Sequence, residues 1–189
     1  ITTRLVGSEM CIRDSNTDRN NDPNFIDPMK NPEVEKYSYC ISFKDDYIIV
    51  DDHRFQANVL VTDSFFLQLM DYPVISGIKT IQRPDDAIIT RKYAKHLFKD
   101  ENPLGKQLVS SAGYTLTIRG IVDEPDTKSS LQFDLITPVN QGKYMDWSRM
   151  GFCITRLVKG TELAKFNEKI SKPQSLICLL YTSPSPRDA

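Results

Sequence analysis

DDAIITRKYAKHLFKDENPLGKQL, residues 85–108, is the stretch that decides the fold. Its apolar run at 87–89 predicts a short strand, because it is bounded by turn-forming and polar residues. Thr90 follows and is suited to cap a helix, since its hydroxyl can accept a hydrogen bond from the first helical turn. The helix then places four side chains on one face, at Tyr93, Ala94, Leu97 and Phe98.

Downstream of this helix the sequence predicts a β-hairpin. Pro103 and Gly105 form a turn, and a new strand begins at residues 107–109. Residues 110–113 close the hairpin, and residues 114–122 return with apolar and polar side chains in alternation.

Upstream, a second hairpin precedes a short helix. Residues 37–43 alternate loosely, and runs at 47–50 (YIIV) and 55–61 (FQANVLV) flank an acidic turn, which indicates two paired strands. Asp63 or Ser64 is then expected to cap a short helix that Pro73 ends.

The last part of the chain adds strands at 131–135 and 152–158 and a helix at 161–170, whereas residues 16–32 are polar and predict a loop. Short strands mixed with short helices, without a repeating strand–helix rhythm, predict the α+β class. The periodicities also predict a buried core of Phe65, Phe66, Leu69, Tyr93, Leu97, Phe98, Leu116, Ile118 and Phe133.

The two ends of the chain have a different origin. DNA that encodes residues 5–15 (LVGSEMCIRDS) can be written so that its reverse complement, shifted by one base, encodes residues 178–187 (CLLYTSPSPR). This inverted copy resembles a transposase-type sequencing-library adapter left at both ends of a DNA fragment. Such segments must be excluded before a fold is interpreted. We therefore expect residues 1–15 and 177–189 to be non-native, adapter-derived tails that pack poorly, and residues 16–176 to be the domain.

The composition of the domain excludes several classes of function. The tails hold as many acidic as basic residues, so the formal net charge of −1 is unchanged, and mixed charge of this kind gives no electrostatic footprint for nucleic acid. Only Cys40 and Cys153 remain of the four cysteines, which favours two ordinary thiols over a disulfide framework.

No motif for catalysis or nucleotide binding is complete. Gly105-Lys106 lacks the earlier glycine and the following Ser or Thr of a phosphate-binding loop, so a turn glycine beside a solvated lysine is the better interpretation. His53 is expected in a polar turn and His96 on the exposed face of the helix, and neither has the spacing of a metal site.

Acidic pairs and isolated polar residues also have simpler explanations. The pairs at 45–46, 51–52 and 85–86 lack the dense oxygen ligands of a calcium loop and are typical of turns. Ser64 is outside any nucleophile motif, and Trp147 is expected in the core or at its rim. We therefore predict no catalytic, cofactor-binding or metal-binding residue, and no cofactor.

Three blocks, in this order, resemble the MacB-like periplasmic core domain of FtsX/MacB-type permeases of ABC transporters. The similarity runs from about residue 31 to residue 170, and the main departure is Lys99, where the family usually has glycine. The blocks are VTDSFFLQLMDYPVISG (61–77), DDAIITRKYAKHLFKDENPLGKQL (85–108) and YTLTIRGIVDEPDTKSSLQFDLITP (114–138).

The resemblance implies a fold, partners and a location. The fold is a porter-like α+β subdomain with an inserted strand-rich subdomain. The implied partners are a cytoplasmic ABC ATPase subunit or domain, a second permease chain in a homodimer or heterodimer, and a periplasmic or outer-membrane protein, but no nucleic acid. The parent protein would lie in the bacterial cytoplasmic membrane with this domain in the periplasm, and the domain itself would carry no catalytic residues.

The favoured interpretation is thus a non-enzymatic, extracytoplasmic domain of an ABC transporter permease, which couples ATP hydrolysis by the partner to export or to mechanotransmission in the envelope. The alternatives are a stand-alone secreted or periplasmic binding module of the same fold, and an enzyme whose site has no recognisable motif. A parent gene with one hydrophobic span before residue 16 and three after the domain would select the permease.

Overall fold

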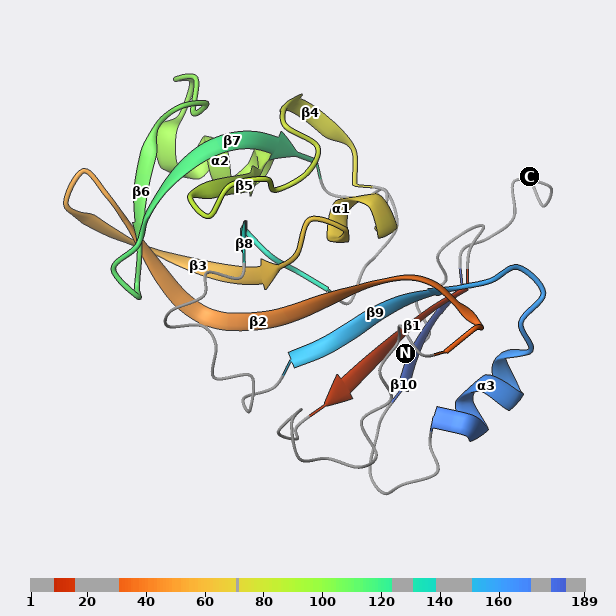
Figure 1. The fold of residues 1–189 in the computed structure, drawn as a ribbon. Helices are drawn as coiled ribbons and strands as arrows, with labels where there is room; N and C mark the ends of the chain where they lie inside the picture. Colours follow the sequence, from red (N-terminus) through yellow and green to blue (C-terminus); the bar gives the residue numbers. More distant parts are fainter. Residues whose placement is uncertain are drawn as a thin grey trace. The chain divides into compact units, whose positions relative to one another are not determined.

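The computed structural model describes residues 9–15, 31–70, 72–123, 131–138, 151–170 and 178–182, the first and last of these ranges by their backbone alone (Figure 1). The chain divides into two compact units. We call Cys40–Asp146 the middle unit, and Ile1–Tyr39 together with Trp147–Ala189 the terminal unit.

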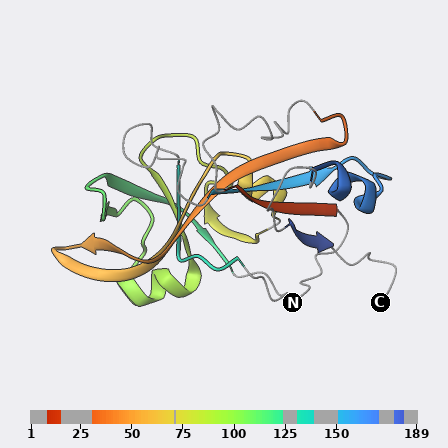
Figure 2. The same ribbon diagram turned by 90° about the horizontal axis from the view of Figure 1, so that it is seen from below.

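The middle unit is a mixed sheet with a helix on it. Its pairs are antiparallel except for β3 with β8 and β5 with β7. Helix α2 (Arg91–Phe98) contacts β5 and β7 and lies on one side of the strands (Figures 1 and 2). The strand order is β2 (Val34–Val50), β3 (His53–Thr62), β8 (Leu135–Pro138), β5 (Asp86–Thr90), β7 (Thr115–Val122) and β4 (Val74–Gly77), with β6 (Gln107–Ser110) paired to β2 and β7.

The predicted hairpin around an acidic turn is confirmed, but its first strand is longer than expected. Asp51 and Asp52 have φ angles of 47° and 62°, which suit the two-residue turn that matches the twist of paired strands. The break predicted before residue 47 is instead an irregularity within β2, between Phe43 and Asp46. Asp45 stands there with a φ of 57° and accepts a hydrogen bond from Gln56 Nε2 at 2.7 Å. The extra residue thus bends one continuous strand rather than ending it.

The strand–helix transition at Thr90 forms as the sequence predicts. Thr90 Oγ1 accepts a hydrogen bond from the Tyr93 N–H at 3.2 Å, so the side chain satisfies one of the free donors of the first turn. Tyr93, Ala94 and Phe98 are buried under the helix.

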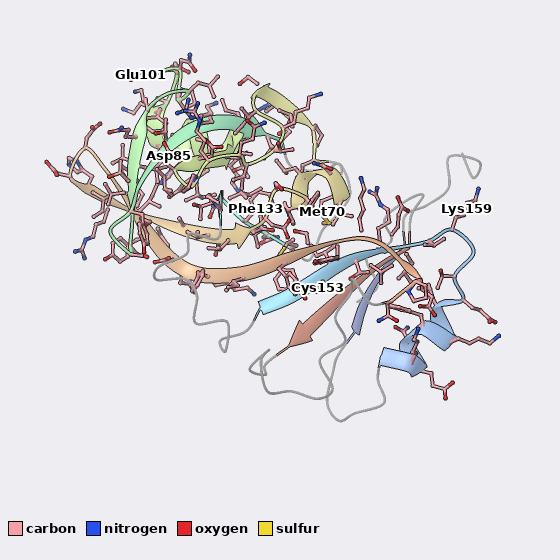
Figure 3. The ribbon with its side chains drawn as sticks, viewed as in Figure 1. Met70, Asp85, Glu101, Phe133, Cys153 and Lys159 are labelled. Carbon is pink, nitrogen blue, oxygen red and sulfur yellow. The ribbon has the colours of Figure 1, made fainter. Side chains whose placement is uncertain are left out.

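Most of the predicted core is buried, with two corrections. Phe66 has no exposed surface, and Phe133 (Figure 3) packs edge-on against Phe66 and Tyr72 at ring-centroid distances of 5.9 and 5.0 Å. Phe65, by contrast, is 49% exposed, and Leu97 is only half-buried. Phe65 lies before the first residue of α1, outside its buried face. Leu97 lies about 100° around α2 from the buried Phe98, at the edge of the buried face.

Two predicted element boundaries were wrong. Helix α1 (Phe66–Leu69) starts after Phe65 without a side-chain cap, and Asp63 Oδ1 instead accepts from the Phe65 N–H at 2.9 Å before the helix begins. Strand β8 begins at Leu135, not at residue 131. Asp134 precedes β8 but is still bonded to the neighbouring strands: its N–H donates to Asn58 O at 2.8 Å, and its carbonyl accepts from Thr90 N at 3.0 Å.

The terminal unit contains the predicted last strand and helix. These are β9 (Gly151–Leu157) and α3 (Leu163–Ile170). Glu33 joins both: its carbonyl accepts from Val158 N at 2.9 Å, and its carboxylate accepts from Lys169 Nζ at 2.9 and 2.8 Å. The hydrogen bond from Lys169 lowers the pKa of the Glu33 carboxyl. The α+β class is confirmed in this unit and in the middle unit.

The expectation that the ends pack poorly is wrong for the backbone of two segments. The structure places them in β1 (Glu9–Ser15) and β10 (Cys178–Thr182), and β1 is antiparallel to both β9 and β10. A strand edge offers unpaired N–H and C=O groups to any chain with strand propensity, so pairing of this kind needs no selected side-chain match. The pairing does not test whether the ends derive from an adapter, and their adapter origin stays a prediction.

A close backbone approach joins β4 to β7. Gly77 has a φ of 82°, and a Cβ placed on it would lie 2.0 Å from Arg119 O. Gly113 has the same φ of 82°, but a Cβ there would meet nothing within 4 Å. Substitutions at the two glycines therefore distinguish two costs: both impose a side chain on a left-handed backbone, but only the one at Gly77 also creates a steric overlap.

Gly77→Ala should destabilise the protein more than Gly113→Ala. The Gly113 variant carries only the left-handed backbone penalty, roughly 1–2 kcal/mol. The Gly77 variant must also move β4 away from β7, which adds about 2 kcal/mol or more. Chemical denaturation of both variants measures this difference, and equal losses would contradict the close approach.

Phe98→Ala should lower the free energy of unfolding by about 3–5 kcal/mol, because it leaves a cavity beneath α2. Phe65→Ala is the matched control, since the same change at a half-exposed ring should cost less than about 1 kcal/mol. Denaturant melts of both variants test the assignment. A loss below about 1 kcal/mol for Phe98→Ala would mean that this face of α2 meets solvent.

Candidate functional site

The lysine that follows Gly105 has a structural role. Gly105 N donates to Ile118 O at 2.8 Å within the turn. The Lys106 ammonium bonds the Glu101 carboxylate and lies 4.6 Å from the centre of the Phe98 ring. That hydrogen bond holds the pKa of Glu101 below its usual range. The turn at Gly105 is confirmed, but Lys106 is not the solvated lysine that the sequence predicts, because it is bonded to Glu101 and lies over Phe98 of α2.

The acidic pair at 85–86 stabilises a loop. Asp86 is 1% exposed, and its Oδ2 accepts hydrogen bonds from the backbone N–H groups of Gln82 and Arg83, both at 2.8 Å. Its Oδ1 lies 3.3 Å from Arg119 Nε, an ion-pair distance without hydrogen-bond geometry. Among the described residues, no group of three or more His, Cys, Asp or Glu could hold a metal ion.

The remaining sequence candidates are a histidine and two cysteines, each with a contact of its own. His53 Nδ1 is 2.7 Å from Asp51 O in the exposed hairpin turn. Cys40 and Cys153 are buried thiols rather than halves of a disulfide, as the sequence predicts, and their sulfur atoms lie 3.3 Å from Thr62 Oγ1 and 3.5 Å from Thr155 Oγ1 respectively. Trp147 lies outside the described residues.

The structure brings other side chains together in a groove of about 630 Å³ in the middle unit. Strand β3 contributes two amide side chains, α2 contributes four side chains, and one carboxylate comes from just before β8. The lining residues are Gln56, Asn58, Lys92, Tyr93, Lys95, His96 and Asp134. Of these residues, the sequence suggested only His96 as a candidate for chemistry, and it assigned Tyr93 to the core. The sequence did contain a signal for this groove: Lys92, Lys95 and Lys99 are spaced three and four residues apart, so they lie on one face of the predicted helix.

Two of the lining residues, Asn58 and Asp134, are bonded to each other. The Asp134 carboxylate accepts from the Asn58 backbone N–H at 2.8 Å and from Asn58 Nδ2 at 3.0 Å, and the Asp134 N–H donates to Asn58 O at 2.8 Å. Hydrogen bonds to a carboxylate are stronger than those between neutral groups, so this three-bond contact fixes the segment before β8 onto β3.

Tyr93 and His96 form the helical wall. Tyr93 is 4% exposed, and its hydroxyl donates to Gln56 O at 2.9 Å. Burial raises the pKa of this phenol, and the nearby charge of Asp134 raises it further, so the hydroxyl remains a donor. The His96 ring stacks on Tyr93 at 6.0 Å and meets the edge of Phe55 at 5.9 Å. The groove thus offers cations and amides around a fixed aromatic wall.

Comparison with known proteins supplies the family. The sequence profile of the MacB-like periplasmic core domain matches residues 7–172, which is most of the chain. This chain belongs to the MacB-like periplasmic core domain family. The resemblance carried by the three sequence blocks is therefore confirmed. A search of curated proteins finds no match.

Solved structures support the fold at low sequence identity. A domain described as part of a permease from Porphyromonas gingivalis is 16% identical with a TM-score of 0.66, over 96% of this chain and 94% of that one. The periplasmic region of MacB from Actinobacillus actinomycetemcomitans is 14% identical with a TM-score of 0.68, over 89% and 83%. The extracellular domain of the noncanonic ABC-type transporter YknZ from Gram-positive bacteria is 16% identical with a TM-score of 0.59, over 89% and 98%.

Within the described ranges, no helix of this MacB-like domain is both long and apolar enough to cross a membrane.

The main departure from the family pattern lies at the end of α2. Lys99, at the position where the family usually has glycine, has φ 56° and ψ −113° and closes the helix by donating its N–H to Lys95 O at 3.0 Å. A side chain is disfavoured in this conformation, whereas glycine adopts it freely.

Lys99→Gly should therefore stabilise the domain by about 1 kcal/mol, because the strain at the helix end is removed. Lys99→Ala is the control, since it removes the same charge but keeps a Cβ and should bring little gain. Thermal or chemical melts measure the difference. A destabilised glycine variant would show that the Lys99 conformation is not strained.

Proposed function

We propose that this chain is the extracytoplasmic domain of an ABC transporter permease. In this proposal it couples ATP hydrolysis by a partner ATPase in the cytoplasm to export or to mechanotransmission across the envelope. The supporting observation is the family match over residues 7–172. Two of the similar structures are the periplasmic region of MacB and the extracellular domain of an ABC-type transporter, which agrees with such a role.

The roles of the polar residues favour a mechanical domain over an enzyme. The side chains that suggested chemistry in the sequence hold loops and turns together: Lys106 bonds Glu101, and Asp86 accepts from two backbone N–H groups. Such contacts stiffen connections between strands. A stiff domain transmits a displacement applied at its ends, whereas a compliant one absorbs it.

The proposal includes a location and partners. The parent permease lies in the bacterial cytoplasmic membrane, with this domain in the periplasm. It functions as a homodimer or heterodimer of permease chains, together with the ATPase and a periplasmic or outer-membrane protein. The domain itself catalyses no reaction and holds no cofactor.

A proline at Leu157 tests the coupling. Leu157 is the last residue of β9 and is 3% exposed. Proline removes the backbone N–H and restricts φ, so Leu157→Pro in the parent permease should abolish export while the partner ATPase still hydrolyses ATP. Leu157→Val keeps the backbone N–H and puts a β-branched apolar side chain, which suits a strand, in place of leucine, so it should retain export. Transport and ATPase assays in vesicles measure both activities.

Two outcomes would contradict the proposal. Full export by the proline variant would mean that β9 does not take part in coupling. Measurable ATP binding by the isolated chain in calorimetry would contradict its place across the membrane from the nucleotide.

A further inference from the structure

The outer side of α2 is basic along its whole length. The exposed residues of the helix are Arg91, Lys92, Lys95 and His96, and the exposed Lys99 follows as its C-cap. Arg91 forms an ion pair with Asp123 at 2.9 Å. Lys92 and Lys95 form no ion pair with any residue in the part of the chain that the structure describes. Their charges are therefore available to a partner.

These two lysines line the groove beside β3 rather than a flat surface. The groove has one acidic lining residue, Asp134, against the two lysines. The Asp134 carboxylate already accepts two hydrogen bonds from Asn58, which lowers its repulsion of an incoming anion. The local field in the groove thus favours negative charge, although the whole chain has a net charge of −1.

The two amide residues that line the groove, Gln56 and Asn58, suit a peptide backbone. Gln56 Nε2 donates to Asp45 and Asn58 Nδ2 donates to Asp134, so both side-chain carbonyl oxygens remain as acceptors. The residues that α2 contributes to the groove are fixed in place: the Tyr93 hydroxyl donates to Gln56 O, and the His96 ring stacks on Tyr93. A pre-formed wall lowers the entropic cost of binding.

We propose that this groove binds an acidic, extended segment of a partner protein. Carboxylates of the segment pair with Lys92 and Lys95, and its backbone N–H groups donate to the side-chain carbonyls of Gln56 and Asn58. A volume of about 630 Å³ accommodates a few residues of such a segment.

A protein segment fits better than an anionic membrane surface. The basic groups surround a concave site with hydrogen-bond acceptors, and a bilayer presents no donors for them. The exposed large hydrophobic residues of the described chain, which could insert into lipid, do not line the groove; they are Phe65, Ile75 and Val158. The inference does not depend on coupling to an ATPase.

Fluorescence anisotropy on the full chain tests the proposal. The probe is a short fluorescein-labelled peptide of alternating glutamate and serine, compared with the same peptide carrying glutamine. The acidic peptide should bind more tightly, and rising salt should weaken it. The double variant Lys92→Glu/Lys95→Glu should weaken binding roughly tenfold or more. The matched control Lys79→Glu/Lys159→Glu makes the same charge change at exposed sites outside the groove and should bind like the parent.

Three results would overturn the proposal. Equal binding of the glutamate and glutamine peptides would show that the groove does not select for charge. Equal loss in both double variants would show that only net charge matters. Binding to phosphatidylglycerol vesicles, but not to the peptide or to phosphatidylcholine vesicles, would identify a membrane surface as the partner instead.

Discussion

The rest of the structure depends on the complete burial of β5. All five of its residues are buried, and Ile88 and Ile89 have no exposed surface. A buried backbone must have its N–H and C=O groups paired, and β7 and β8 flank this strand on its two sides. Asp86 fixes the start of the strand through two backbone N–H groups, and Thr90 ends it by capping α2. Each fully buried isoleucine contributes about 1.5–3 kcal/mol to folding.

This strand also positions the candidate binding groove. Thr90 N, at the end of β5, donates to Asp134 O, and the same Asp134 bonds both the backbone and the side chain of Asn58 in β3. Thr90 simultaneously begins α2, the helix that carries Lys92 and Lys95. The core strand, the helix and two residues that line the groove are therefore joined by direct hydrogen bonds. A change in one of them would reach the others through these contacts.

Membership of a family of periplasmic core domains agrees with how this chain uses its charged residues. Glu33 joins β9 to α3, Lys106 closes a turn over Phe98, and Asp86 holds the loop before β5. The unpaired lysines of α2 differ from these, because they line a groove and support nothing within the described chain. The placement of these lysines therefore indicates a binding partner at the groove, whereas the other charged residues named here have structural roles within the domain.

The sequence by itself determined the family, the α+β class, the acidic hairpin turn and the Thr90 cap, because each is encoded within a few neighbouring residues or in blocks of fixed order. Only the tertiary structure decided that Phe66 and not Phe65 faces the core, and that β2 continues through an irregularity beside Asp45. It also decided the groove, where Asn58 and Asp134 meet across 76 positions of sequence. Periodicity states which side chains share a face, but contacts between distant segments depend on how the strands pair.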